Sequence, residues 1–106
     1  MKSHTHVVIV GGGIMGVSLL YHLTKEGWCD IVLIEKGELT SGSTWHAAGQ
    51  CPHFVGSYNA AKIHNYSNKL YQDLEKETGQ STGWHGCGSL RLALNEDDID
   101  WFHYVK

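Results

Sequence analysis

The feature that most constrains the fold is a glycine-rich turn that directly follows a short apolar run. Residues 7–10 are Val-Val-Ile-Val, and a run of β-branched residues is typical of a strand buried on both faces of a parallel sheet. Gly11, Gly13 and Gly16 follow in the spacing G-x-G-x-x-G. In this spacing the first glycine makes a tight turn, the second lets a pyrophosphate approach the backbone, and the third lets the next helix pack closely on the strand.

The residues after this turn complete the pattern of a dinucleotide-binding βαβ unit. Residues 17–25 carry apolar side chains at helical spacing, and Gly27 is placed to end that helix. Residues 31–34 predict a second buried strand, and Glu35 stands at its end, where an acid accepts hydrogen bonds from the ribose of an adenine dinucleotide. The alternative is a βαβ unit that binds nothing. We favour the binding unit because the acid and both strands stand where it needs them.

Composition restricts the class of protein further. The chain has 106 residues, a net charge of −3 and no basic excess, so we expect one domain and no nucleic-acid partner. Its apolar runs are too short to span a membrane, and we expect no membrane association. The first strand begins so early that no room is left for a leader peptide, which predicts a cytoplasmic protein. Three cysteines without a C-x-x-C motif predict reduced thiols.

The second half of the chain predicts further elements. Residues 36–50 form a loop rich in Gly, Ser and Thr, which is either a plain connector or a loop that wraps a cofactor. Residues 58–78 read as a helix that Gly79 ends, and residues 89–94 alternate apolar and polar, which predicts a strand of an antiparallel sheet. Asn95 is placed to cap a last helix that begins at Glu96.

These elements define the expected fold class and domain organisation. The class is α/β: a Rossmann-like βαβ unit at the start of a larger doubly wound domain, followed by the beginning of an antiparallel substrate-domain sheet. A dinucleotide-binding sheet usually has five or six strands, and two are found here in the right arrangement. Residues 1–106 are therefore expected to be the amino-terminal part of a larger, truncated oxidoreductase domain.

One loop segment carries a family resemblance. Residues 41–49, S-G-S-T-W-H-A-A-G, follow G-G-G-I-M-G and L-I-E-K and closely resemble the dimethylglycine and sarcosine dehydrogenase family, flavoproteins of the D-amino-acid-oxidase-like superfamily. Residues 62–67 and 83–93 resemble the segments that follow in the same family. The resemblance implies FAD, an N-methyl amine substrate and hydride transfer to the flavin. It also implies that the iminium formed is either hydrolysed or passed to folate through a further carboxyl-terminal domain. For a processed eukaryotic form it implies the mitochondrial matrix.

The resemblance also assigns residues to the cofactor. His46 matches the histidine that is covalently joined to the flavin 8α carbon, and a neutral imidazole nitrogen suits that attack. No catalytic residue is assigned within the chain, because the family's substrate-binding residues are expected beyond Lys106. The cofactor-binding residues implied are Gly11, Gly13, Ile14, Met15, Gly16, Glu35, Lys36, Gly42, Ser43, Thr44, Trp45, His46, Ala47, Ala48, Gly49 and Gln50.

Three other interpretations stay open at this stage. The first is that the chain is an inactive truncated fragment, which binds an adenine nucleotide weakly or not at all. An NAD-dependent dehydrogenase is a further candidate, because Glu35 would serve either dinucleotide, although such an enzyme does not need the T-W-H-A-A-G loop. A structural zinc site is the third, and its ligands would be Cys51, His53, His85 and Cys87. The C-x-H spacing is tighter than zinc sites usually show, so we disfavour it.

Overall fold

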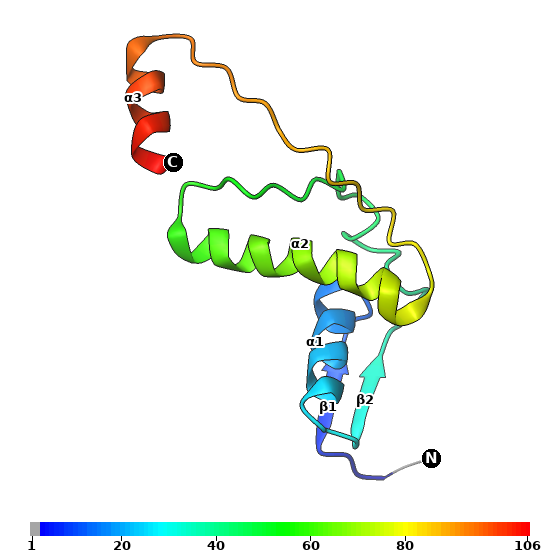
Figure 1. The fold of residues 1–106 in the computed structure, drawn as a ribbon. Coiled ribbons are helices and arrows are strands. Elements are labelled where there is room, and N and C mark those ends of the chain that lie inside the picture. Colours follow the sequence, from blue (N-terminus) through cyan, green and yellow to red (C-terminus); the bar gives the residue numbers. More distant parts are fainter. Residues whose placement is uncertain (1–2) are drawn as a thin grey trace. The chain divides into compact units, whose positions relative to one another are not determined.

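The structure is a computed structural model that describes residues 3–106. The chain divides into two compact units, Met1–Gln50 and Cys51–Lys106. The first unit contains β1 (Val7–Val10), α1 (Ile14–Lys25) and β2 (Ile31–Ile34), and the second contains α2 (Tyr58–Thr78) and α3 (Glu96–Val105) (Figure 1). This is an α/β chain, as the sequence predicts.

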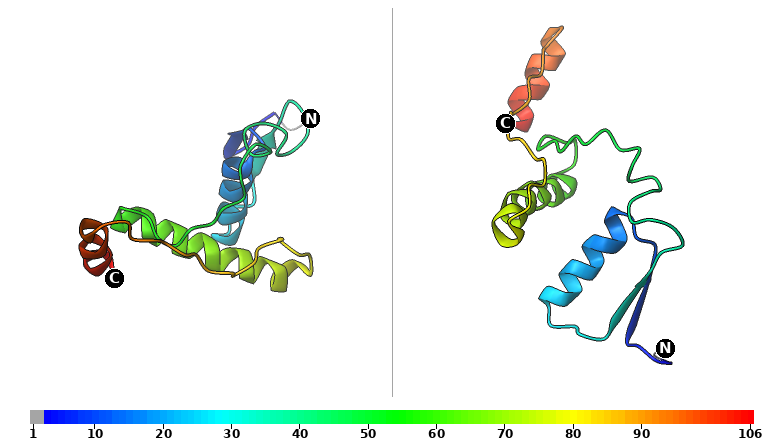
Figure 2. Two further views of the ribbon diagram at one scale, coloured as in Figure 1. Left: turned by 90° about the horizontal axis from the view of Figure 1, so that it is seen from above. Right: turned by 90° about the vertical axis from the view of Figure 1, so that its right-hand side faces the viewer.

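The first unit is the predicted βαβ unit. Strands β1 and β2 pair in parallel, with Val7 opposite Ile31 and Val10 opposite Ile34. Helix α1 forms the connection between them and covers one face of the two-stranded sheet (Figure 2). Because both strands run the same way, their carboxyl ends meet at one edge, and the glycine turn and Glu35 follow directly from that edge.

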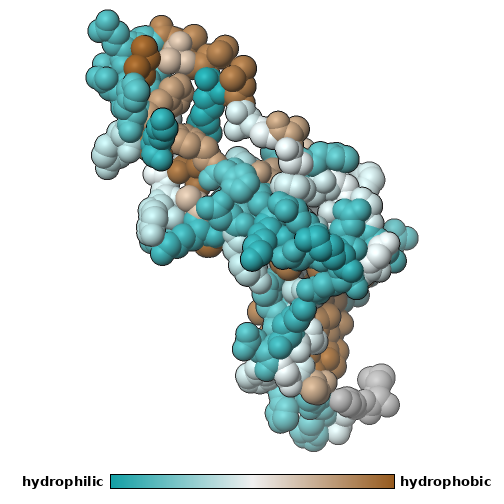
Figure 3. Space-filling model, in the orientation of Figure 1, coloured by the Kyte–Doolittle hydropathy of each residue, from teal (hydrophilic) through white to brown (hydrophobic). Residues whose placement is uncertain are grey.

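The predicted burial of both faces of the strands is wrong for this chain. Ile9 is 5% exposed on the face that α1 covers, whereas Val8, Val10 and Ile34 are half or more exposed. Apolar side chains of the first unit accordingly gather at the surface along the strands (Figure 3). The physical reason is that residues 3–50 contain one helix, which covers a single face of the pair.

Helix α1 begins earlier than the sequence pattern predicts, at Ile14 rather than Val17. Gly13 precedes it in an extended conformation, and Gly16 therefore lies in the first helical turn. The predicted end at Gly27 is confirmed. Gly27 has φ +87°, its N–H donates to the Thr24 carbonyl at 3.1 Å, and the next N–H donates to the Leu23 carbonyl at 3.0 Å. This pair of bonds is the Schellman arrangement that closes a helix.

The helix ends of the second unit also follow local sequence signals. Gly79 has φ +69° and donates its N–H to the Glu75 carbonyl at 2.9 Å, which ends α2. Asn95 caps α3, because its Oδ1 accepts the Asp98 N–H at 2.8 Å. Both predictions are confirmed because each depends on groups within a few residues.

The predicted antiparallel strand over residues 89–94 is wrong for this structure. Residues 80–94 form neither helix nor strand, and Leu90, Leu92 and Leu94 are 86%, 72% and 86% exposed. The beginning of a substrate-domain sheet is therefore absent from the described residues. A strand is stabilised by a neighbour that shares its backbone hydrogen bonds, and no described segment pairs with this one.

Candidate cofactor site

The site begins with the tight packing of α1 on the glycine turn. Gly11 has φ +107°, a conformation that side chains rarely adopt, and its N–H donates to the Ile34 carbonyl at 2.8 Å. A Cβ placed on Gly16 would lie 1.9 Å from the Gly11 carbonyl oxygen and 3.4 Å from Ile9 Cγ2. The helix therefore approaches the strand as closely as only glycine permits.

The start of α1 presents unpaired backbone donors. The first N–H that is bonded inside the helix is that of Val17, which donates to the Gly13 carbonyl at 3.0 Å. Within residues 3–106, the N–H groups of Gly13, Met15 and Gly16 form no hydrogen bond. Free N–H groups at the positive end of a helix dipole form an anion site. The turn therefore fits the phosphates of a dinucleotide.

Glu35 connects the end of β2 to this turn. Its Oε2 accepts the Gly12 N–H at 2.6 Å, and its Oε1 accepts the Gly37 N–H at 2.9 Å. The bond from Gly12, followed by that from Gly37, holds the pKa of the carboxyl below its usual value, and the adjacent Lys36 charge acts in the same direction. The carboxylate stays ionised at neutral pH, and each oxygen keeps acceptor capacity for a ribose hydroxyl.

The loop after β2 folds back onto the glycine turn. The Thr40 N–H donates to the Gly12 carbonyl at 2.9 Å, and Thr44 Oγ1 accepts the Ile14 N–H at 3.0 Å. Thr40 has φ +65°, and the residues after it form consecutive turns. Two bonds between distant segments distinguish this loop from a plain connector.

His46 lies two residues after Thr44, whose side chain is bonded to the start of α1. Its backbone N–H donates to the Ser43 carbonyl at 3.2 Å, and its side chain is exposed and forms no hydrogen bond within residues 3–106. The neighbouring Trp45 is 78% exposed. The imidazole is thus accessible and chemically uncommitted.

The structure brings together part of the residue set that the sequence analysis assigned to the cofactor. The glycine turn, the first residues of α1, Glu35 and Thr44 are linked by the bonds described above. Three further backbone groups were missed, and they belong to Gly12, Gly37 and Thr40. The sequence signal for Gly12 is its place between two motif glycines. The structure gives the reason for a glycine there, because an added Cβ would lie 2.5 Å from Leu39 Cδ2. The remaining assigned residues are exposed and lie along the loop: Lys36, Gly42, Ser43, Trp45, His46, Ala47, Ala48, Gly49 and Gln50.

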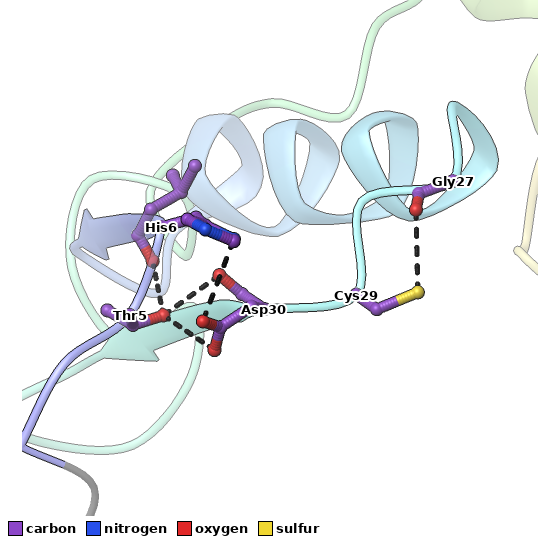
Figure 4. Close-up of polar contacts among 6 residues, drawn as sticks. Thr5, His6, Gly27, Cys29 and Asp30 are labelled. Carbon is purple, nitrogen blue, oxygen red and sulfur yellow. Dashed lines mark hydrogen bonds and ion pairs between the residues drawn. The ribbon is translucent and has the colours of Figure 1, made fainter.

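The opposite end of the strands carries a second polar cluster, at the start of β1 and β2 (Figure 4). Thr5 Oγ1 donates to the Asp30 carbonyl at 2.9 Å, and His6 Nδ1 lies 3.7 Å from Asp30 Oδ2. The Cys29 thiol donates to the Gly27 carbonyl at 3.4 Å. Thr5 and His6 thus contact Asp30 across the two strands, while Cys29 bonds within its own turn.

Among residues 3–106 no cysteine forms a disulfide, and the reduced thiols stay a prediction. The four residues considered for zinc do not gather. Among residues 3–106, no three His, Cys, Asp or Glu side chains are placed to hold a metal ion. His53 Nδ1 instead contacts Asn65 Oδ1 in a short hydrogen bond. No helix among the described residues is long and apolar enough to cross a bilayer.

Comparison with known proteins defines the class to which this site belongs. A family profile described as "DAO: FAD dependent oxidoreductase" matches residues 6–105. The chain therefore belongs to this family of FAD-dependent oxidoreductases, and the family identifies FAD as the dinucleotide. The NAD-dependent alternative is not favoured.

Particular relatives narrow the resemblance. The chain is 54% identical to rat mitochondrial dimethylglycine dehydrogenase over 103 residues, which cover 97% of this chain and 12% of the relative. It is 50% identical to the mouse mitochondrial pyruvate dehydrogenase phosphatase regulatory subunit over 99 residues, 93% of this chain and 11% of that protein. It is 39% identical to human mitochondrial sarcosine dehydrogenase over 101 residues, 94% of this chain and 11% of that enzyme. The chain thus spans about an eighth of the length of these relatives.

A solved structure supports the fold. The crystal structure of glycine oxidase from Bacillus cereus matches 96% of this chain and 29% of its own, with a TM-score of 0.68 and 25% sequence identity. The resemblance predicted from residues 41–49 is confirmed at the level of the family.

Proposed function

We propose that this chain supplies the FAD-binding portion of an enzyme that oxidises an N-methyl amino acid. The observation that carries the proposal is the glycine turn, where free N–H groups of α1 and the ionised Glu35 lie on one edge of a parallel sheet in a chain of this family. The named dehydrogenases that the chain resembles support dimethylglycine as the substrate, with sarcosine as the related alternative.

In this proposal each group at the edge of the sheet has a defined role. The N–H groups of Gly13, Met15 and Gly16 donate to the pyrophosphate, because they are unpaired and lie at the positive end of α1. Glu35 accepts hydrogen bonds from the ribose. The Gly42–Gln50 stretch lies along the pyrophosphate and the edge of the flavin. When bound, FAD supplies the hydride acceptor, so the protein's own task is to bind and orient.

His46 is the proposed point of covalent attachment. His46 would hold the flavin through one imidazole nitrogen, which would lose its proton and replace one hydrogen of the 8α methyl group. That hydrogen would also leave as a proton, and the two electrons released would pass to dioxygen. The exposed, unbonded imidazole is free to make this bond. We propose that Trp45 and Ala47 flank the same flavin edge.

The reaction that follows is an oxidative demethylation. A hydride leaves the N-methyl carbon while the nitrogen lone pair forms the C=N bond of an iminium ion. Water adds to that carbon and releases formaldehyde, or the one-carbon unit passes to folate bound by a further domain. We propose that residues 1–106 form the amino-terminal part of the oxidoreductase domain, and that the residues that touch the substrate lie outside this chain.

The cellular location is part of the same proposal. Several relatives carry the word mitochondrial in their names. We propose the cytoplasm for a bacterial form of this protein and the mitochondrial matrix for a processed eukaryotic form.

Anaerobic mixing with candidate amines tests the proposed activity. The complete protein that contains this chain is purified with FAD, and dimethylglycine, sarcosine or glycine is added without oxygen. We expect dimethylglycine to bleach the visible absorbance of the oxidised flavin fastest. A protein that holds FAD but is bleached by none of the three would contradict the proposed reaction. It would favour a regulatory role, because one relative is named a pyruvate dehydrogenase phosphatase regulatory subunit.

A further inference from the structure

We propose that Thr44 is a positioning residue, whose bond to the first turn of α1 holds the loop in the place from which His46 meets the flavin. The inference rests on the proposed covalent bond at His46. It assigns Thr44 a role in the rate of that attachment, separate from the binding of FAD.

The contact between Thr44 and the helix is specific and tight. Thr44 Oγ1 accepts the Ile14 N–H at 3.0 Å, and a Cβ placed on Gly13 would lie 3.0 Å from the same oxygen. Thr44 is half-buried, while Ser43 and Trp45 on either side of it are exposed. One side chain of this loop segment therefore enters the glycine turn, and Gly13 leaves the space for it.

A second bond restricts the same loop from its other end. The Thr40 N–H donates to the Gly12 carbonyl at 2.9 Å, and the Trp45 N–H donates to the Thr40 carbonyl at 3.1 Å. The His46 N–H donates to the Ser43 carbonyl at 3.2 Å. His46 thus follows a segment that is held at two points, which limits the positions its ring can reach. The rate of a reaction between two bound groups depends strongly on how the groups are positioned relative to one another.

The same bond divides the backbone donors between two tasks. The Ile14 N–H is used by Thr44, so the pyrophosphate is left with the unpaired N–H groups of Gly13, Met15 and Gly16. A competing arrangement would have phosphate take the Ile14 N–H and Thr44 bind phosphate through its hydroxyl. The two arrangements predict different effects for substitutions at either end of the bond.

Substitutions at both ends of the bond test the inference in the complete protein. Thr44→Val removes the acceptor at nearly constant shape, and Thr44→Ser keeps it. Ile14→Pro removes the donor at the first helical position, where proline is tolerated, and the extended Gly13 before it (φ −78°, ψ −178°) is compatible with a following proline. Ser41→Ala is the matched control, because it removes a bond from Ser41 Oγ to the Glu38 carbonyl within the loop.

The readout is the rate at which acid-stable flavin forms after apoprotein is mixed with saturating FAD, expressed per bound FAD. We expect Thr44→Val and Ile14→Pro each to slow attachment by about tenfold or more, since misplacement of a reacting group by about an ångström costs rates on this scale. The double variant should be no slower than either single one, and Thr44→Ser and Ser41→Ala should attach flavin at the wild-type rate.

Three results would overturn the inference, each in a recognisable way. Unchanged attachment per bound FAD in Thr44→Val would show that the bond does not position His46. Weaker FAD binding in both variants with unchanged attachment would assign Ile14 and Thr44 to the phosphate instead. Absence of acid-stable flavin from the wild type would contradict the proposed bond at His46 and the inference with it.

Discussion

At the scale of single residues, Glu35 connects three parts of the site. Its two oxygens hold the backbone of Gly12 in the glycine turn and of Gly37 at the start of the loop, and each keeps acceptor capacity for the proposed ribose. The ribose-binding acid of the sequence pattern is therefore also a structural group. Its substitution should affect the turn even without a cofactor.

The lowered pKa of Glu35 makes this contribution pH-dependent. A carboxyl whose pKa is lowered on folding stabilises the fold above its unfolded pKa, and the stabilisation is lost as pH falls through the lowered folded pKa. We expect Glu35→Gln to lower the free energy of unfolding at neutral pH, and the difference from wild type to close in acid below the usual glutamate range. Denaturant titrations of the complete protein and its variant across that pH range measure this difference. A difference that stays constant with pH would contradict the assignment.

His46 gives the second prediction at this scale. His46→Ala should remove acid-stable flavin while reversible FAD binding is kept, because the proposed phosphate donors are backbone N–H groups of the glycine turn. Mass analysis of proteolytic peptides should find the flavin on the peptide that contains His46 in the wild type. Flavin found on another residue would disprove the assignment.

At the scale of elements, the contact of α1 with β1 depends on Gly16. An added Cβ would lie 1.9 Å from the Gly11 carbonyl oxygen, a distance that backbone cannot accommodate without moving the helix. We expect Gly16→Ala to lower the free energy of unfolding of the complete protein by about 1–3 kcal/mol, the range typical of overpacking, and its thermal midpoint to fall with it. Gly56→Ala is the matched control, because nothing lies within 4 Å of its added Cβ. Equal effects of the two substitutions would contradict the close-packing account.

The ends of the helices could be predicted from the sequence, whereas the strand and the long-range bonds could not. The ends of the helices at Gly27 and Gly79 and the cap at Asn95 were predicted, because each depends on hydrogen bonds within a few residues. The strand over 89–94 was predicted wrongly, because alternation reports a preference and a strand also requires a partner. The bonds from Gly12 to Glu35 and from Ile14 to Thr44 join residues 23 and 30 positions apart, so no local pattern could reveal them.

At the scale of the whole molecule, the chain buries little apolar surface. Within residues 3–106, Ile9 is the one hydrophobic residue that is buried. Val10, Leu90 and Tyr104 are each more than 80% exposed. Exposed apolar surface of this kind is typical of a face that packs against another protein segment. The chain also spans about an eighth of the length of the relatives named above.

The 106 residues expressed alone are therefore expected to oligomerise or to unfold without a cooperative transition. Size-exclusion chromatography and a thermal melt followed by circular dichroism measure this. A monomer with a sharp melt would show that the exposed faces need no partner.

We propose that the turn formed by residues 11–16, together with Glu35, binds FAD. The flavin content of the complete protein, purified under native conditions and then incubated with FAD, measures this binding. We expect one FAD for each chain and no comparable retention of NAD. A correctly folded protein that retains NAD, or neither dinucleotide, would contradict it.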